Sequence, residues 1–260
     1  MINFPACCGM LRRAPLAQKF LDGVRTMEKM EVLVERALRT VFQDDSIVYD
    51  KSRFAGGLTN YNYIMEIHGK AYVVREPGVM TDKMLNRPVE QVNNMIASGL
   101  GVNSVCVYFD EKTGIKISEY VHHGQNFAVL NPNAPECTRA VAALLKTLHA
   151  SPKPFQNVFD WEAELLKYEH IVQDLNGQLF SDYPHLKSEL LRFIKENVTS
   201  LELLPCHNDT VPENFLMDTA TNRPYLIDWE YAGMNDPTWD IAAYIGESRL
   251  TRQAIDDLFS

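Results

Sequence analysis

The chain has 260 residues, of which 46% are hydrophobic, and a formal net charge of -9 at pH 7. This length is sufficient for a buried core, either in one large domain or in two lobes around a cleft. The acidic balance argues against a nucleic-acid partner, because a phosphate-binding surface needs clustered Lys and Arg. The five cysteines include no Cys-x-x-Cys pair, which argues against a disulfide framework or a zinc site.

The sequence contains no apolar run long enough to span a bilayer, and its first residues lack the basic and apolar segments of a secretory signal. We therefore expect a cytoplasmic protein without a membrane partner. Residues 1–27 show no sustained periodicity, and we expect them to form a poorly ordered appendage. Beyond them, Met30, Leu33, Ala37, Leu38 and Val41 recur at helical spacing and predict an amphipathic helix.

The next part of the chain changes to a strand pattern. Alternating residues over 61–67, the turn His68-Gly69 and the β-rich segment that ends at Arg75 predict a hairpin. A helix is expected over 88–97, because Pro88 is suited to a first helical turn. A second hairpin is expected to pair 105–109 with 115–119 across a Gly-containing turn.

Helical patterns dominate the remainder. Asn133 with Glu136 resembles a capping box ahead of a helix over 140–149. Further helices are expected over 161–175 and 184–197, and short apolar strands over 203–206, 215–217 and 225–227. The sequence thus predicts an α+β fold with a strand-rich first lobe over 28–121 and a helix-rich second lobe over 122–260.

A group of polar residues in the second lobe is suited to phosphoryl transfer. That reaction needs an oriented acceptor oxygen and neutralised phosphate charge. Asp209 and Asn214 share one loop, and Asp228 ends a short apolar strand that a hairpin over 219–224 brings back to them. Carboxylate and amide oxygens are ligands that Mg²⁺ accepts. Asx residues also form turns, so the prediction depends on their joint spacing.

The segment from Cys206 to Leu216, followed by Tyr225 to Gly233, resembles the choline/ethanolamine kinase and aminoglycoside phosphotransferase superfamily, especially its bacterial choline-kinase-like branch. The resemblance covers about residues 28–250 and implies a protein-kinase-like fold with a small β-rich N-lobe and a helical C-lobe. It implies that Asp209 orients or deprotonates the substrate hydroxyl, while Asn214 and Asp228 hold Mg²⁺.

Two further residues of the second lobe have a structural role by this resemblance. His207 would brace the catalytic loop, and Asp240 would anchor that loop from behind. An ordinary core histidine and a helix-start carboxylate are the alternative interpretations.

The resemblance also implies a site for ATP in the first lobe. Arg75 would hold the α- and β-phosphates, Glu90 would pair with it, and Ser118, Glu119 and Tyr120 would form the hinge that meets adenine. A solvated Arg and a surface Glu are the alternatives. Small and polar residues ahead of the first hairpin would let backbone amides approach the phosphates, although a turn alone would also explain them; they are Gly56, Gly57, Thr59 and Asn60.

The acceptor is expected to lie near an aromatic and acidic set, which is suited to a quaternary ammonium group. The set comprises Trp229, Glu230, Tyr231, Trp239, Tyr244 and Glu247. Core packing is the alternative for its aromatic members. By resemblance, Glu247 lies beside the bound ammonium and Glu230 nearer the metal strand, while Trp239 and Tyr244 are further candidates. Members of the family continue past this point with helices that complete the pocket. By resemblance, the C-terminal part of this chain, which ends at Ser260, is therefore short for the family.

The predicted activity is the ATP- and Mg²⁺-dependent transfer of the γ-phosphate to a small amino alcohol, with choline ahead of ethanolamine. An aminoglycoside or other small-alcohol phosphotransferase is one alternative. A nucleotide-binding pseudokinase with weak activity is another. The sequence does not predict the oligomeric state.

Overall fold

The computed structural model describes residues 30–56, 60–78, 81–198 and 201–260, so the prediction for residues 1–27 lies outside the described residues. The chain divides into two units, Met1–Arg53 and Phe54–Ser260. In the described part of the first unit, a helix runs over residues 30–42 and buries Val34 and Leu38. Arg39 Nε donates to Ile47 O at 2.9 Å, which ties the helix to the segment after it. The predicted amphipathic helix is therefore present.

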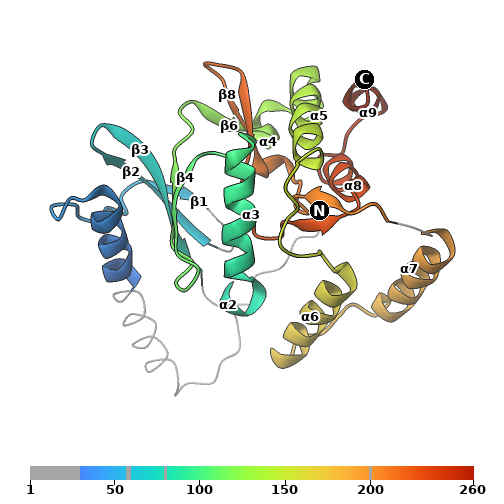
Figure 1. The fold of residues 1–260 in the computed structure, drawn as a ribbon. Coiled ribbons are helices and arrows are strands. Elements are labelled where there is room, and N and C mark those ends of the chain that lie inside the picture. The colour runs from blue at the N-terminus through green and yellow to red at the C-terminus, as the bar shows by residue number, and fades with distance from the viewer. Residues whose placement is uncertain (1–29, 57–59, 79–80, 199–200) are drawn as a thin grey trace. The chain divides into compact units, whose positions relative to one another are not determined.

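The second unit begins with a sheet and ends with helices (Figure 1). Its elements are β1 (Phe54–Gly56), β2 (Asn60–Ile67), β3 (Lys70–Pro77), α2 (Thr81–Met84), α3 (Arg87–Gly99), β4 (Cys106–Phe109), β5 (Lys116–Glu119), β6 (Gly124–Asn126), α4 (Phe127–Leu130), α5 (Pro135–His149), α6 (Trp161–Asp174), α7 (Tyr183–Asn197), β7 (Leu204–Cys206), η1 (Pro212–Asn214), β8 (Phe215–Asp218), β9 (Arg223–Leu226), β10 (Gly233–Asn235), α8 (Thr238–Glu247) and α9 (Arg252–Leu258).

The first sheet has the strand order β1-β2-β3-β5-β4, and all its neighbours are antiparallel. Both predicted hairpins are present in it, as β2–β3 and β4–β5. The predicted helix after the first hairpin is α3, whose N-cap is Asn86. It lies against β4 (Figure 1), and its inward side buries Glu90 and Asn93. Glu90 contacts Arg75 of β3, whereas Asn93 donates to Ala232 O at 2.8 Å, so α3 presents buried polar groups both to the sheet and to the second half of the chain.

The main core lies among the helices and short strands of the second half. Phe127, Leu148, Phe215, Trp229 and Tyr244 are fully buried there. Strands β8 and β9 form the predicted hairpin, with Phe215 opposite Leu226. Strand β7 pairs with β10, and β6 pairs with β8. These pairings fix the loops that follow β7 and β9 beside one another.

The predicted capping box at Asn133 is wrong. Helix α5 begins at Pro135 with Ala134 as its N-cap residue, and no side chain caps it. The side chain of Asn133 instead accepts a hydrogen bond from Thr251 N at 2.7 Å. Asn133 therefore serves the start of α9, whose position no local sequence pattern specifies.

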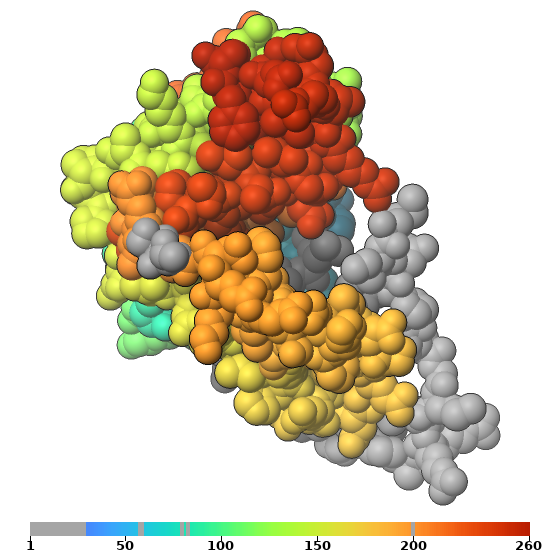
Figure 2. Space-filling model, turned by 90° about the vertical axis from the view of Figure 1, so that its right-hand side faces the viewer, coloured from blue at the N-terminus to red at the C-terminus, as the bar shows by residue number. Residues whose placement is uncertain are grey.

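Helices α6 and α7 lie side by side (Figure 2, yellow and orange). Neither helix contributes a residue to the main hydrophobic core. No residue of either helix is fully buried. Glu169 of α6 joins them, because its carboxylate accepts from Tyr183 Oη at 2.6 Å and from Lys187 Nζ at 2.7 Å. Among the described helices, none has both the length and the apolar character that a membrane crossing requires.

Candidate active site

The loop after β7 is held by one buried carboxylate from α8. Asp240 Oδ2 accepts from His207 N at 2.9 Å, and Asp240 Oδ1 accepts from Asn208 N at 2.7 Å. His149 Nε2, at the end of α5, lies 3.0 Å from Asp240 Oδ2. Asp240 itself is fully buried. The structure thus shows the contact between Asp240 and the loop that the resemblance implied.

The same loop is tied to the segment that carries Asp228. The ring of His207 is 2.9 Å from Ile227 O through Nε2 and packs edge-on against Trp229, with ring centroids 4.7 Å apart. Asn208 Nδ2 donates to Tyr231 O at 2.9 Å. Asn208 and Asp228 both have positive φ, 66° and 69°. Non-glycine residues rarely adopt this conformation without support from their surroundings, and it often marks a functional position.

Asp209, Asn214 and Asp228 are brought to one place. The amide nitrogen of Asn214 donates to Asp209 O at 2.9 Å and to Asp209 Oδ2 at 3.0 Å. Ile227 N donates to Asn214 O at 2.9 Å, so the residue next to Asp228 is bonded directly to Asn214. Burial raises the pKa of Asp209, and the charge of Asp228 adds to this effect. The carboxylates of Asp209 and Asp228 are therefore close enough to interact electrostatically.

The residues present fit a hard divalent cation. Asn214 uses its amide nitrogen for Asp209, which leaves the amide oxygen as a possible ligand. The carboxylate of Asp228 has no hydrogen bond within the described part of the chain, yet it lies close enough to Asp209 to raise the pKa of that residue. Carboxylate and amide oxygens form the ligand class that Mg²⁺ takes.

Between β3 and α3, the predicted ion pair of Arg75 and Glu90 is present. Arg75 Nη1 is 2.5 Å from Glu90 Oε1, and Arg87 Nη1 is 2.7 Å from Glu90 Oε2. Arg75 Nη2 also donates to Gly114 O at 3.2 Å, and its guanidinium lies 5.1 Å from the centre of the Phe109 ring. Burial alone would raise the pKa of Glu90, but the charges of Arg75, Lys116 and Arg87 lower it. Glu90 is therefore held as a carboxylate.

Glu230, which was expected nearer the metal strand and was included among the candidate acceptor residues, contacts this ion cluster. It accepts a hydrogen bond from Asn60 Nδ2, and its Oε1 lies 3.5 Å from Arg75 Nη1 and 3.8 Å from Arg87 Nη1. Burial raises the pKa of Glu230 to about 7, and the charge of Asp228 contributes to the rise. Arg87 was not among the predicted site residues, although its position three residues before Glu90 in a predicted helical region was a usable signal.

A cavity of about 410 Å³ lies between the ion cluster and the metal-binding candidates. Its lining includes the predicted residues Asn60, Arg75, Ser118, Glu119, Tyr120 and Asp228. Gly56 ends β1 and accepts from Asn62 Nδ2 at 3.0 Å, whereas Gly57 and Thr59 lie outside the described residues. The cavity thus brings together most of the nucleotide-binding candidates that the structure describes.

The hinge prediction needs one refinement. Glu119 N donates to Val105 O at 2.8 Å, and Tyr120 N donates to Ala71 O at 3.0 Å. These two N–H groups are therefore used by the protein and are not available to a base. Val121 also lines the cavity. Its N–H makes no hydrogen bond among the described residues, which makes it the better candidate donor at this hinge.

The predicted acceptor residues separate into two groups. Tyr244 is fully buried, with its ring centroid 5.1 Å from that of Phe215, so it belongs to the core and does not line an acceptor pocket. Trp229 is fully buried as well. Trp239 is 37% exposed and packs against Phe159. Glu247 is exposed at the end of α8, and its charge makes a small contribution to the raised pKa of Asp209.

A pair of tyrosines lies within electrostatic range of Glu230 and Asp209. The hydroxyl groups of Tyr168 in α6 and Tyr231 lie 2.7 Å apart. Burial raises the pKa of Tyr231, and the Tyr168 hydroxyl and the charges of Glu230 and Asp209 contribute. Tyr231 was among the predicted aromatic set, but Tyr168 was not, because nothing in its local sequence separates it from an ordinary helix residue.

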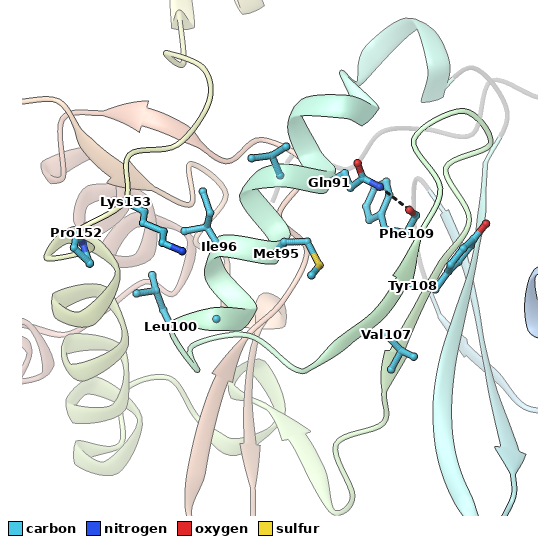
Figure 3. Close-up of a pocket in the computed structure, with 11 residues that line it drawn as sticks. Gln91, Met95, Ile96, Leu100, Val107, Tyr108, Phe109, Pro152 and Lys153 are labelled. Carbon is cyan, nitrogen blue, oxygen red and sulfur yellow. Dashed lines mark hydrogen bonds between the residues drawn. The ribbon is translucent and has the colours of Figure 1, made fainter. Parts of the chain in front are cut away.

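A second cavity, of about 700 Å³, lies on the outer side of α3 (Figure 3). Met95 and Ile96 line it from α3, Leu100 lines it from the C-cap of that helix, and Val107 lines it from β4. Gln91 Nε2 donates to Phe109 O at 2.7 Å at one edge. None of the predicted site residues lines this cavity. The candidate chemistry is therefore confined to the inner side of α3.

Comparison with known proteins agrees with this geometry. Residues 52–259 match the family model described as the phosphotransferase enzyme family. The chain is 35% identical over 205 residues to Protein LicA of Haemophilus influenzae, an alignment that covers 78% of this chain and 60% of that protein. This chain therefore spans less than two thirds of that relative's length.

Solved structures give the same relationship. The structure of choline kinase LicA from Streptococcus pneumoniae superposes with a TM-score of 0.72 at 29% identity, covering 86% of this chain and 78% of that chain. A structure of LicA in complex with AMP superposes with a TM-score of 0.73 at 29% identity, covering 88% and 78%. The α+β, protein-kinase-like fold expected from the sequence is confirmed.

Proposed function

The chain belongs to the phosphotransferase enzyme family, and from this premise we propose that it transfers the γ-phosphate of ATP to the hydroxyl group of a small amino alcohol, with choline as the first candidate. The observation that carries the proposal is the assembly of Asp209, Asn214 and Asp228 through the hydrogen bonds from Asn214 Nδ2 to Asp209 and from Ile227 N to Asn214 O. Phosphoryl transfer depends mainly on such positioning and on charge stabilisation.

Asp209 is the candidate group for the acceptor hydroxyl. Its raised pKa makes its carboxylate a better proton acceptor than an ordinary aspartate. The hydrogen bond from Asn214 fixes one of its oxygens, which orients the other. Asp209 therefore binds the hydroxyl group, aligns its oxygen with the phosphate and takes its proton as the new bond forms.

Asn214 and Asp228 are the residues that would hold Mg²⁺. When bound, this ion neutralises phosphate charge in the transferred group. On the other side of the cavity, Arg75 would hold the phosphates, and Glu90 fixes the orientation of its guanidinium. The family match and the AMP complex of LicA support a nucleotide in this cavity.

Choline is favoured by two observations. The solved LicA relative is named a choline kinase. In this chain, the charges of Glu247 and Asp209 interact, and the aromatic side chain of Tyr231 also lies within electrostatic range of Asp209. A quaternary ammonium cannot donate an N–H hydrogen bond, so aromatic faces and a carboxylate are the groups that recognise it.

The test is ADP release with choline, ethanolamine and an aminoglycoside as separate acceptors, in the presence of Mg²⁺. We expect turnover with choline and a loss of about 100-fold or more in kcat for Asp209→Asn, with ATP binding retained. Asp256→Asn is the matched control, because Asp256 is 59% exposed in α9. Turnover with the aminoglycoside alone would reject the amino-alcohol acceptor, and silence with all three would reject the transferase activity.

A further inference from the structure

A second basic residue, Lys116, faces the nucleotide cavity beside Arg75. Lys116 begins β5 and lies directly opposite Arg75 of β3 in the sheet register. Residues directly opposite each other in a sheet present their side chains to the same face. Both residues line the cavity of about 410 Å³, together with Asp228. The sheet thus presents two cations side by side to one cavity.

The protein itself makes little use of the Lys116 ammonium group. Its Nζ lies 3.9 Å from Glu90 Oε1, which is beyond hydrogen-bond distance. Both oxygens of Glu90 are already bonded, one to Arg75 and one to Arg87. Lys116 makes no other ion pair and no side-chain hydrogen bond within the described ranges. An ammonium group has three donors, so this side chain, only 12% exposed, has donors to offer to a ligand.

The position is also unfavourable for a charge in the empty protein. Burial lowers the pKa of Lys116, and the neighbouring charge of Arg75 lowers it further. A buried cation without good partners reduces the stability of the fold. A hydrophobic residue would therefore be the better choice for folding alone, and such costly polar groups are typical of binding sites.

The balance of charges around Lys116 favours the binding of an anion. Three cations, Arg75, Arg87 and Lys116, surround the two carboxylates of Glu90 and Glu230. Counted at their formal charges, these five groups carry one net positive charge. Asp228 also interacts electrostatically with Lys116, but it is the proposed metal ligand and its charge is used there.

We propose that Lys116 is a second phosphate-binding residue of the nucleotide cleft and contacts the phosphate groups of ATP together with Arg75. This inference rests on the proposed function, because ATP is what brings phosphates into the cavity. It assigns the excess positive charge of the ion cluster to the ligand. The bound phosphates in turn supply the acceptors that the ammonium group lacks in the protein alone.

The experiment compares Lys116→Met with Lys112→Met by calorimetric titration of adenosine, ADP and ATP. Lys112 is an exposed residue of the turn in the same hairpin, so its substitution removes one charge without touching the cavity. We expect Lys116→Met to bind ADP and ATP about 10- to 100-fold more weakly, and adenosine within about twofold of wild type. Lys116→Arg keeps the charge and is expected to bind ATP more tightly than Lys116→Met.

Thermal unfolding without nucleotide separates this role from a structural one. Removal of a poorly partnered buried ammonium should leave the Tm of Lys116→Met unchanged or higher. If Lys116 served only to support Glu90, the Tm would fall, and adenosine and ATP would lose affinity by the same factor. That pattern would overturn the inference.

Different results would reject the role of Lys116 and the proposed function. A wild-type protein that binds ATP, with Lys116→Met binding ADP and ATP as tightly as Lys112→Met does, would reject the role of Lys116 and leave the proposed function intact. A wild-type protein that binds none of the three ligands would reject both.

Discussion

Gly114 occupies a position that admits no other residue without displacing the ion cluster. Its φ is +76°, a region that side chains disfavour. A Cβ atom at this position would lie 2.9 Å from Arg87 Nε and 3.2 Å from Arg87 Cζ. Its carbonyl oxygen accepts the hydrogen bond from Arg75 Nη2. This one turn residue therefore accepts a hydrogen bond from Arg75 and, by having no side chain, leaves space for Arg87.

We predict that Gly114→Ala weakens ATP binding and destabilises the fold by about 1–3 kcal/mol, since it combines a strained φ with a displaced buried arginine. Gly69→Ala is the control, because Gly69 has the same φ of +76° and a Cβ atom there would have nothing within 4 Å. Denaturant unfolding of both variants isolates the effect of the contact. Equal losses in the two variants would show that only backbone strain matters.

Cys137 allows a second prediction for a single side chain, this time in the core. It is fully buried in α5, and burial raises the pKa of its thiol to about 11, with a smaller contribution from Glu136. Because the folded pKa exceeds the unfolded value, the stabilisation is complete below the unfolded pKa and is lost as the pH rises toward the folded value. Between these values the unfolded chain releases a proton that the folded chain retains.

The unfolding free energy should therefore fall faster with pH in wild type than in Cys137→Ala. We expect the difference between them to shrink by about 1 kcal/mol between about pH 8 and about pH 10. Urea titrations at the two pH values measure it, and the variant cancels the contributions of the other ionisable groups. Parallel changes in the two proteins would contradict the assigned pKa shift.

At the scale of an element, helix α5 has an uncapped start. Its N-cap residue, Ala134, provides no side-chain acceptor, and its φ and ψ of -69° and 138° are those that a capping residue adopts. The missing cap is the physical reason why the sequence-based start of this helix was wrong. Asn133 has the right chemistry for a cap, but it bonds to Thr251 instead.

We predict that Ala134→Ser stabilises the protein by about 0.5–1 kcal/mol and raises its Tm by about 2–4 °C, because a serine hydroxyl would accept a free N–H of the first turn. Pro135→Ala serves as a comparison that alters the same turn without adding an acceptor. Calorimetry measures both. No gain from serine would mean that water already satisfies these N–H groups.

The elements that the sequence predicted correctly are those with a local pattern. The alternation over β2 and the helical periodicity of α6 and α7 need no distant partner to be recognised. Strands β6 and β10 were missed, because each has three residues and owes its existence to a distant partner, β8 or β7. These two strands can therefore be recognised only when the position of the partner strand in the fold is known.

The site shows the same division. Asp209, Asn214 and Asp228 could be grouped from their spacing, because two adjacent strands deliver them. The partners of Glu230 and Tyr244 could not be predicted, since a sequence gives the identity of a side chain but not the direction in which it points. Glu230 faces Arg75, and Tyr244 faces Phe215. Lys116 was not predicted as a site residue, because a lysine at the first position of a hairpin strand ordinarily faces solvent.

For the molecule as a whole, the location of the cations matters more than their number. The chain carries a net charge of -9, yet Arg75, Arg87 and Lys116 gather in one buried cluster of the second unit. Buried charges are screened little by salt, whereas the field of exposed charges at a distance is screened strongly. An approaching anion therefore meets repulsion from the molecule before it meets the attraction of the cavity.

This arrangement has a consequence for the kinetics of encounter. The association rate of free ATP should rise severalfold as the ionic strength increases from about 50 mM to about 300 mM, because screening removes the long-range repulsion. The dissociation rate should change little, since short-range contacts in the buried cavity control it. Stopped-flow measurements with a fluorescent ATP analogue would separate the two rates. Because the net charge is negative and these three cations are buried, we expect the protein to bind ATP faster at higher ionic strength. An enzyme that attracts anions with a basic surface shows the opposite salt dependence.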